Sequence, residues 1–385
     1  MNSRQRVILS LNHEEPDKVP MDFAGSLTNV GINIEAHQKL KKHLGLNGGK
    51  EEIVDYIQQL VMPDQRIVEI FGADIKAVCS RSPHSWQLNI EEDDISYYFF
   101  DEWGIKFLMP KGHGYYFDPV EFPLSNVKDA EELNDMKWPD PFDPGRIEGL
   151  AEDVKHLYEN TEYALLFGPT TGIFETAFFL RGMETFLLDF MTNLKLAEAI
   201  MDKLLEYHLG FWEHTLPLVG KYIQIAKMSD DLGHQQGLLI SPELYRKVVK
   251  PRQKELFSFI KKRTGAKIYL HSCGSIAMLM QDFIDCGVEV INPVQPLAKG
   301  MNTAKLKIDF GDKMSFWGGI DVQQVLPFGS PSDVRHEVRK RIKDLASGGG
   351  YIAAPSHNIL LDVPAENIVT LYQSVRQYGN YPIQL

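Results

Sequence analysis

The feature that most constrains this fold is the regular alternation of short strands with helices after residue 146. Six segments there are rich in β-branched and aromatic residues, and each is followed by a helical pattern. The predicted strands cover residues 163–167, 222–226, 267–271, 288–291, 314–317 and 351–354, and the predicted helices cover 172–215, 242–263, 276–285, 303–308, 331–346 and 364–378. Repeated strand–helix units of this kind predict a parallel sheet.

Two further strand candidates lie nearer the N-terminus, at residues 19–25 and 73–79, and the second follows a predicted helix at 63–71. Eight parallel strands is the number that closes a (β/α)8 TIM barrel, so we predict an α/β fold of this architecture. A doubly wound open sheet is the structural alternative. We expect residues 1–385 to form a single barrel domain.

Residues 83–145 have a different character from the rest of the chain. They contain an alternating aromatic run at 95–100 and a proline-rich stretch at 138–144. Alternation with turn residues between the runs is typical of antiparallel hairpins. We therefore expect a partly β insertion at 83–145, placed within the barrel domain after its first units.

Charge and composition exclude several classes of protein. Lys and Arg number 40 against 52 Asp and Glu, a formal net charge of −12, and an acidic surface repels the phosphates of nucleic acids. No apolar run approaches the ~20 residues that span a membrane, and the first residues lack the apolar core of a signal peptide. Three cysteines cannot form a disulfide framework in 385 residues, so we expect a cytoplasmic protein without nucleic-acid or membrane partners.

Polar side chains follow several predicted strands, at the end of the barrel where active sites lie. His271 and Cys273 are two residues apart at one strand end, so their side chains leave the same face. An imidazole and a thiolate are good Zn²⁺ ligands, although a buried cysteine beside a hydrogen-bonded histidine is the structural alternative. Because zinc needs three or four ligands, His357 is the best third candidate, with Asp231 next and Cys79 a weak one.

Carboxylates at further strand ends are candidate acid–base groups. Asp231 and Asp321 each follow a predicted strand, as does the imidazole of His357. For any single acid the alternative is a cap on the following helix, and for Asp231 alone that interpretation is preferred. Taken together, the three residues form the predicted catalytic set.

Three segments of the sequence carry a resemblance to a known family. They are YLHSCG at 269–274, WGGID at 317–321 and PSHNI at 355–359, and the last leads into DVPAEN at 362–367. In these segments, and over nearly its whole length, the chain resembles the uroporphyrinogen decarboxylase superfamily. The resemblance implies a (β/α)8 barrel. The superfamily includes haem-pathway decarboxylases, cobalamin-independent methionine synthases, and methyltransferases that serve corrinoid proteins.

The decarboxylase branch implies arginines at the barrel mouth, because a porphyrinogen carries eight carboxylates. That branch has an Arg-Gln-Ala-Gly-Arg motif after the first strand, whereas residues 21–27 here read MDFAGSL. The nearest strand-end guanidinium is that of Arg81. Decarboxylation therefore remains an alternative that electrostatics disfavours, and a non-catalytic metabolite-binding barrel is another alternative.

The corrinoid-linked methyltransferases resemble this chain at His271 and Cys273, where that branch binds zinc. Their third ligand is usually a cysteine in the last strand-end loop, where this sequence has Ser356 and His357, so the third ligand is His357, an acid such as Asp231, or none. The resemblance implies zinc-dependent methyl transfer between a methyl ether, amine or thiol and a corrinoid. The cobalamin would arrive on a partner protein, since the chain lacks a D-x-H-x-x-G signature. The family also suggests that a homodimer can form.

Overall fold

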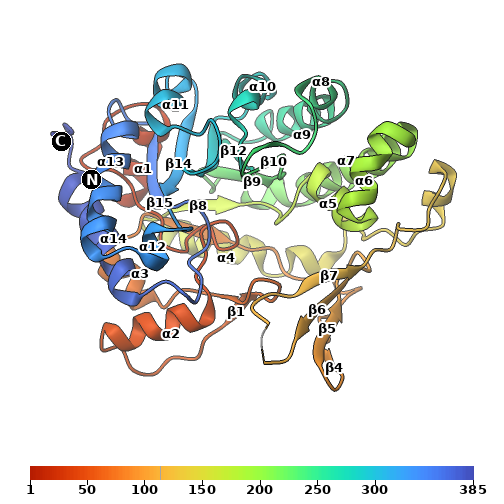
Figure 1. The fold of residues 1–385 in the computed structure, drawn as a ribbon, viewed down its shortest axis with the longest axis horizontal. Helices are drawn as coiled ribbons and strands as arrows, with labels where there is room; N and C mark the ends of the chain where they lie inside the picture. Colours follow the sequence, from red (N-terminus) through yellow and green to blue (C-terminus); the bar gives the residue numbers. More distant parts are fainter. Residues whose placement is uncertain (113) are drawn as a thin grey trace.

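Seven parallel strands form one curled sheet at the centre of the molecule (Figure 1). The computed structural model describes residues 1–112 and 114–385. In spatial order the strands are β15 (Tyr351–Pro355), β14 (Ser315–Ile320), β13 (Val290–Val294), β12 (Lys267–His271), β9 (Ile225–Ser229), β8 (Ala164–Phe167) and β3 (Ile75–Val78). Most of these strands are buried along their whole length, as strands covered on both faces must be.

The first predicted strand closes this sheet into a barrel, although its pairing is much shorter than residues 19–25. Met21 forms a parallel bridge with Ala353 of β15. On its other side, the carbonyl of Met21 accepts the N–H of Asp74, directly before β3, at 2.8 Å. The pairing stays short partly because Pro20 has no N–H to donate. With this eighth segment in place, the prediction of a (β/α)8 barrel is confirmed.

Helices form the outer layer of the barrel (Figure 1). The α-helices are α1 (Ser3–Leu11), α2 (Ile34–His43), α3 (Gln65–Phe71), α4 (Leu150–Asn160), α5 (Ile173–Arg181), α6 (Met183–Thr192), α7 (Leu194–Val219), α8 (Pro242–Leu244), α9 (Lys250–Lys261), α10 (Met280–Cys286), α11 (Thr303–Phe310), α12 (Val325–Phe328), α13 (Pro331–Leu345) and α14 (Ala365–Tyr378). Within the described ranges, no helix has both the length and the apolar character to cross a membrane.

Two helices predicted as continuous are interrupted. The segment 172–215 is divided into α5, α6 and α7, because Gly182 takes a left-handed backbone conformation (φ 81°) between the first two. In the segment 242–263, a π-helical turn at Tyr245–Val249 separates α8 from α9. Pro251 lies two residues after that turn and lacks an N–H, so the regular hydrogen-bond ladder cannot continue through it.

A four-stranded antiparallel sheet lies beside the barrel, within the segment predicted to be partly β (Figure 1). Its strands are β4 (Glu91–Glu92), β5 (Ser96–Phe100), β6 (Lys106–Pro110) and β7 (Asp118–Glu121). Phe99 stacks on its cross-strand partner Phe107 with ring centroids 5.4 Å apart, and Phe117 meets Phe99 edge-on. Phe99, Phe107 and Phe117 therefore form a buried aromatic cluster on one face of this small sheet.

The interior of the barrel is packed with side chains and is closed at its N-terminal end. Trp317 and Tyr269 meet edge-to-face at 5.2 Å, and the indole N–H donates to the buried Asp22 at 3.1 Å. Helix α1 places Val7 and Leu11 against the same interior cluster. Because α1 contacts β8 and β15 at their starts, the opposite, C-terminal end is the one that can admit a substrate.

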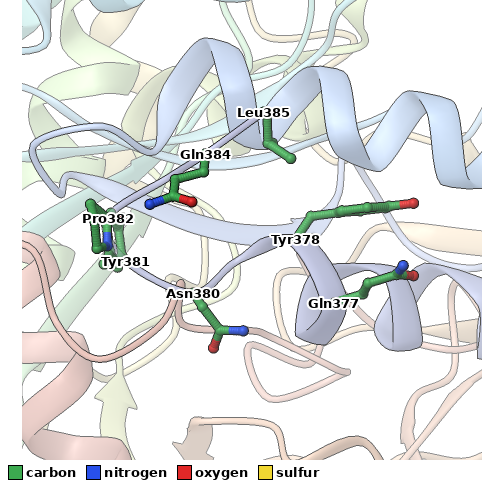
Figure 2. A pocket seen from close by; sticks show the side chains of 7 residues that line it. All are labelled: Gln377, Tyr378, Asn380, Tyr381, Pro382, Gln384 and Leu385. Atoms are coloured by element: carbon green, nitrogen blue, oxygen red, sulfur yellow. The ribbon is translucent and has the colours of Figure 1, made fainter.

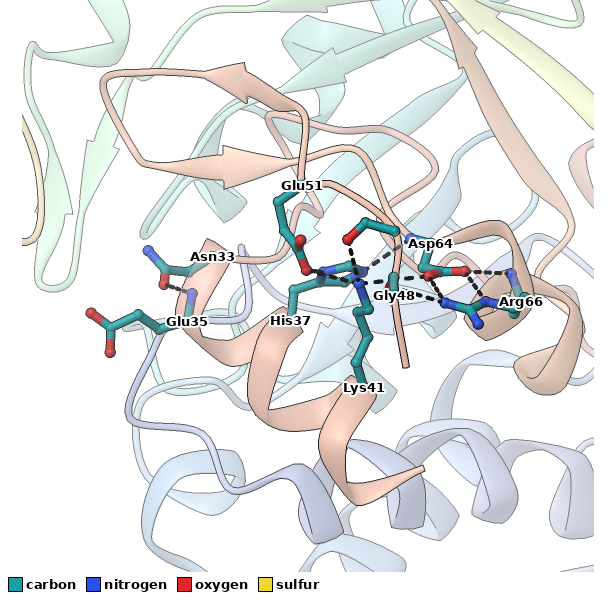
Figure 3. Close-up of polar contacts among 9 residues, drawn as sticks. Asn33, Glu35, His37, Lys41, Gly48, Glu51, Asp64 and Arg66 are labelled. Carbon is teal, nitrogen blue, oxygen red and sulfur yellow. Dashed lines mark hydrogen bonds and ion pairs between the residues drawn. The ribbon is translucent and has the colours of Figure 1, made fainter. Parts of the chain in front are cut away.

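A polar cluster ties the segment before α3 to α2 (Figure 3). The His37 ring is buried, and its Nε2 accepts the Asp64 backbone N–H at 3.0 Å. The proton of the ring therefore sits on Nδ1, which donates to Glu51 at 3.2 Å. Lys41 also binds Glu51, and Arg66 binds the carboxylate of Asp64 at 2.7 Å. Burial lowers the pKa of His37 below its usual value, so the ring is neutral in the folded protein.

We expect the contribution of His37 to stability to decrease as the pH falls. Since folding lowers its pKa, the unfolded state binds the proton more readily, and the loss begins as the pH drops below about 6.5. The test compares the free energies of unfolding of the wild type and His37→Gln at about pH 7.5 and about pH 5. The advantage of the wild type should shrink at the lower pH, and a difference that does not change with pH would contradict the assignment.

Candidate metal centre

Three side chains of ligand type meet at the C-terminal end of the barrel. His271 is the last residue of β12, Cys273 follows two residues later, and His357 lies just after β15. One ligand atom from each residue lies within 4.8 Å of the others, and His271 Nε2 is 3.3 Å from Cys273 Sγ. The two imidazole rings are 5.9 Å apart between centroids. The structure thus brings together three residues that lie up to 86 positions apart in the sequence.

Asn292, in β13, determines which nitrogen of His271 carries the proton. The Asn292 amide donates to the carbonyl of Trp317 at 3.2 Å, which leaves its Oδ1 facing the imidazole. His271 Nδ1 lies 2.6 Å from that oxygen and donates to it. Nε2 therefore presents a lone pair toward Cys273. A histidine that donates its other ring N–H to a carbonyl oxygen is typical of metal-binding sites.

The loop that carries Cys273 is held by its backbone. The N–H of Cys273 donates to Asp231 Oδ1 at 2.8 Å, and the N–H of Gly274 donates to Gln295 Oε1 at 2.7 Å. A Cβ on Gly274 would lie 2.6 Å from the backbone of Gly233, so only glycine allows this approach. The position of the thiol is therefore set by bonds that do not involve its sulfur.

Burial controls the protonation of the three groups. It lowers the pKa of His271 to about 4, and burial together with repulsion from His271 lowers the pKa of His357 to about 4. Burial, reinforced by the carboxylates of Asp231 and Glu175, raises the pKa of the Cys273 thiol well above its usual range. At neutral pH the two imidazoles are neutral bases, and a cation bound between them would displace the proton of the thiol.

The two predicted catalytic carboxylates lie in different places. Asp231 borders the cluster, since its Oδ1 is 3.9 Å from His271 Nε2, and burial raises its pKa. The carboxylate of Asp321 accepts three backbone N–H bonds from residues 323–325 at the start of α12. In the described chain, no hydrogen bond joins Asp321 to His271, Cys273 or His357. Asp321 therefore caps the turn that leads into α12, and its catalytic role stays a prediction.

Two charged side chains near the cluster are missed by the sequence analysis. Strand β9 runs to Ser229, three residues beyond the predicted end. Because Ile225 packs in the barrel interior, the strand's alternation also turns Lys227 inward. Glu175, in α5, accepts the Ser229 hydroxyl at 2.8 Å, and burial together with the nearby Asp231 raises its pKa. Continuing the alternating pattern of β9 would have identified Lys227.

The other two cysteines lie outside the cluster. Cys79 follows β3 and is exposed, and the group of candidate metal ligands formed by the described residues does not include it. Cys286 is buried at the end of α10, where its sulfur lies 4.0 Å from the hydroxyl of Tyr245. That position is at the helix-to-strand end of the barrel, which contributes to stability.

Two pockets lie away from the barrel axis. The first, of about 300 Å³, surrounds the C-terminus and is lined by Gln377, Tyr378, Asn380, Tyr381, Pro382, Gln384 and Leu385 (Figure 2). Asn380 bridges Lys18, at the start of the first barrel segment, so this pocket is on the N-terminal face. The second, of about 240 Å³, includes Tyr116 and Asp362 and lies beside the loop that follows His357. The second pocket is therefore on the face of the barrel that carries the candidate metal ligands.

Known proteins share this architecture. The family model for uroporphyrinogen decarboxylase (URO-D) matches residues 100–378. A methylated-thiol–coenzyme M methyltransferase of Methanosarcina mazei is 25% identical over 240 residues, which is 61% of this chain and 59% of the relative's length. The solved structure of a methyltransferase from Methanosarcina mazei is 18% identical, with a TM-score of 0.63, and the match covers 98% of this chain and 99% of the other. Since the family model spans well over half of its length, the chain belongs to the uroporphyrinogen decarboxylase (URO-D) family.

Proposed function

We propose that this protein is a zinc-dependent methyltransferase that moves a methyl group between a small methylated substrate and a corrinoid carried by a partner protein. The substrate is a methyl ether, amine or thiol. The observation that carries the proposal is the convergence of His271, Cys273 and His357 within 4.8 Å at the open end of the barrel. The two relatives whose names describe methyltransferases support the reaction class.

The donor set of the cluster suits zinc. Imidazole nitrogen and thiolate sulfur are its usual protein ligands, and three protein ligands leave a fourth position for substrate. When bound there, zinc supplies Lewis-acid polarisation of the substrate's sulfur, oxygen or nitrogen atom. The lone pair of His271 Nε2, oriented by Asn292, already faces the sulfur of Cys273.

The residues around the cluster supply the proton chemistry. Asp231 uses Oδ1 to hold the backbone of Cys273, which leaves Oδ2 for a substrate. Because burial raises the pKa of Asp231, its carboxyl group can hold a proton and release it to the leaving heteroatom. Asp231 is therefore the proposed general acid, and in the reverse direction the same oxygen accepts the proton.

We expect Asn292→Leu to weaken zinc binding by about 10- to 100-fold, because the variant removes the acceptor that orients His271. Zinc affinity is measured by competition with a chromogenic chelator. Asn292→Asp is the matched control, because it keeps an oxygen acceptor at the same position and should retain most of the affinity. Equal affinities for the wild type and the leucine variant would show that His271 does not depend on Asn292.

The test of the reaction mixes zinc-loaded protein with reduced corrinoid protein and methylated thiols, methylamines or methoxylated aromatics. We expect the cobalt(I) absorbance to fall only when the protein is present. After a chelator removes the zinc, the absorbance should no longer fall. If the absorbance persists with every substrate class while zinc is bound, the proposed reaction is wrong. Zinc content is measured separately by metal analysis of protein purified without added metal.

Decarboxylation of a porphyrinogen is disfavoured by the charges of the site. Arg81, the guanidinium nearest to the end of β3, pairs with Asp153 at 3.3 Å on the surface. Residues 21–27, which include the first barrel segment and the loop after it, contain no arginine. Eight carboxylates need several matched cations. We therefore expect no conversion of uroporphyrinogen, measured by counting the carboxylates of the product.

A further inference from the structure

We infer that Lys227 forms an anion-binding subsite inside the barrel mouth, which takes the carboxylate or sulfonate of the methylated substrate. The inference rests on the proposed function, because that function supplies the methylated end of the ligand. It adds that the ligand carries a negative charge, and it names the residue that recognises this charge.

The side chain of Lys227 is buried, and the described residues place no matching anion against it. It is 5% exposed, and its ammonium group donates to the hydroxyl oxygen of Thr28 at 3.0 Å. Throughout the chain as described, no carboxylate oxygen lies within 4.0 Å of Lys227 Nζ. Lysines are almost never buried unless they are paired, because an ammonium loses its hydration there. Burial of the charged ammonium therefore raises the free energy of the unliganded protein, and binding of an anion would offset this loss of hydration.

The strand register and the contact with Thr28 place the side chain of Lys227 between the barrel interior and the mouth. In the pairing of β9 with β12, Lys227 is opposite Tyr269 and Ser229 is opposite His271. The Lys227 backbone is thus about 7 Å deeper in the barrel than the His271 level, at ~3.3 Å per residue. Its four-carbon side chain extends back toward the mouth, since its partner Thr28 belongs to the loop after the first barrel segment.

Thr28 links the subsite to the loop of the third ligand candidate. The Thr28 carbonyl accepts the amide of Asn358 at 3.1 Å, and Asn358 directly follows His357. While Thr28 Oγ1 accepts from Lys227, its own O–H remains able to donate to a ligand. Two N–H groups of the ammonium and one hydroxyl therefore form the donor set of the subsite. Such donors match the several oxygens of a carboxylate or sulfonate.

The acidic groups around Lys227 act on it only at longer range. Burial lowers its pKa to about 8, while the more distant Cys79, Asp55 and Glu175 favour the charged form. The lysine is therefore still mainly protonated at neutral pH. The positive charge remains available to a substrate.

The experiment measures binding by calorimetry to the full chain without added corrinoid. The probes are 3-(methylthio)propanoate, 2-(methylthio)ethanesulfonate and the neutral 3-(methylthio)propanamide. The first two compare a carboxylate with a sulfonate, and the third is an uncharged molecule of similar shape. We expect the wild type to bind one of the anions at least about 10-fold more tightly than the amide. Lys227→Met should remove this preference, so that the anions no longer bind more tightly than the amide. Lys221→Met, which removes one exposed lysine from the surface, is the control for net charge.

A second measurement separates recognition from a structural role. Lys227→Met removes a buried unpaired charge, so its thermal stability should equal or exceed that of the wild type. Equal affinities of the wild type for the anions and the amide, no binding of any probe, or an unchanged preference in Lys227→Met would overturn the inference. These outcomes do not depend on methyl transfer, so a failure of the corrinoid assay remains distinguishable from a failure of the subsite.

Discussion

Replacing Cys273 with alanine should remove zinc and reduce kcat/KM for methyl transfer by on the order of 10³-fold, while the barrel stays folded. The thiol supplies one of three donors, and two imidazoles alone hold zinc weakly. The fold is preserved because Asp231 and Gln295 accept backbone N–H groups of the loop, and these bonds remain when the sulfur is removed. Metal analysis, steady-state kinetics and circular dichroism check the three parts of this prediction.

Two further variants make the result specific. His271→Ala should lose zinc to a similar extent, because its Nε2 is the donor nearest to the thiol. Cys79→Ala is the matched control, since it removes another cysteine that is exposed after β3 and lies outside the cluster. Full zinc occupancy in either ligand variant, or an equal loss in Cys79→Ala, would show that the metal is bound elsewhere.

Trp317→Ala should destabilise the protein by about 3–5 kcal/mol, measured as the free energy of unfolding in urea. Trp317 is fully buried at the centre of the barrel, and the variant leaves a cavity against Tyr269. It also removes an N–H that donates to Asp22, a buried carboxyl group whose pKa burial already raises to about 6. Loss of that donor adds to the cost of the cavity.

An exposed aromatic residue provides the comparison for this variant. Phe328, at the end of α12, is 77% exposed, so Phe328→Ala should change the free energy of unfolding by less than about 0.5 kcal/mol. The difference between the free energies of unfolding of the two variants measures how much a buried aromatic side chain in the barrel core contributes to stability. A loss below about 1 kcal/mol in Trp317→Ala would show that the interior layer repacks around the missing indole.

The sequence alone determined the parallel architecture and the pairing of two of the three residues of the candidate site. Buried parallel strands leave a visible pattern of short apolar runs between helices, and this pattern located the strands from residue 163 onward to within a few positions. The two-residue period of a strand likewise placed His271 and Cys273 on one face. Both features are local, because they depend on repeats within a few residues. The helix breaks at Gly182 and before Pro251 also have local causes, but their positions were not anticipated.

Closure of the barrel decided the remaining features, which are the pairing of the eighth segment, the position of His357 and the surroundings of Lys227. The local pattern predicts a strand at 19–25, but its short pairing at Met21 is set by Ala353 and Asp74, which lie on either side of Met21 in the closed barrel. Closure also brings His357 to the thiol from 84 residues away in the sequence. The register of β9 against β12 places Lys227 inside the barrel. These contacts depend on strand order and register across the barrel, which tertiary packing selects.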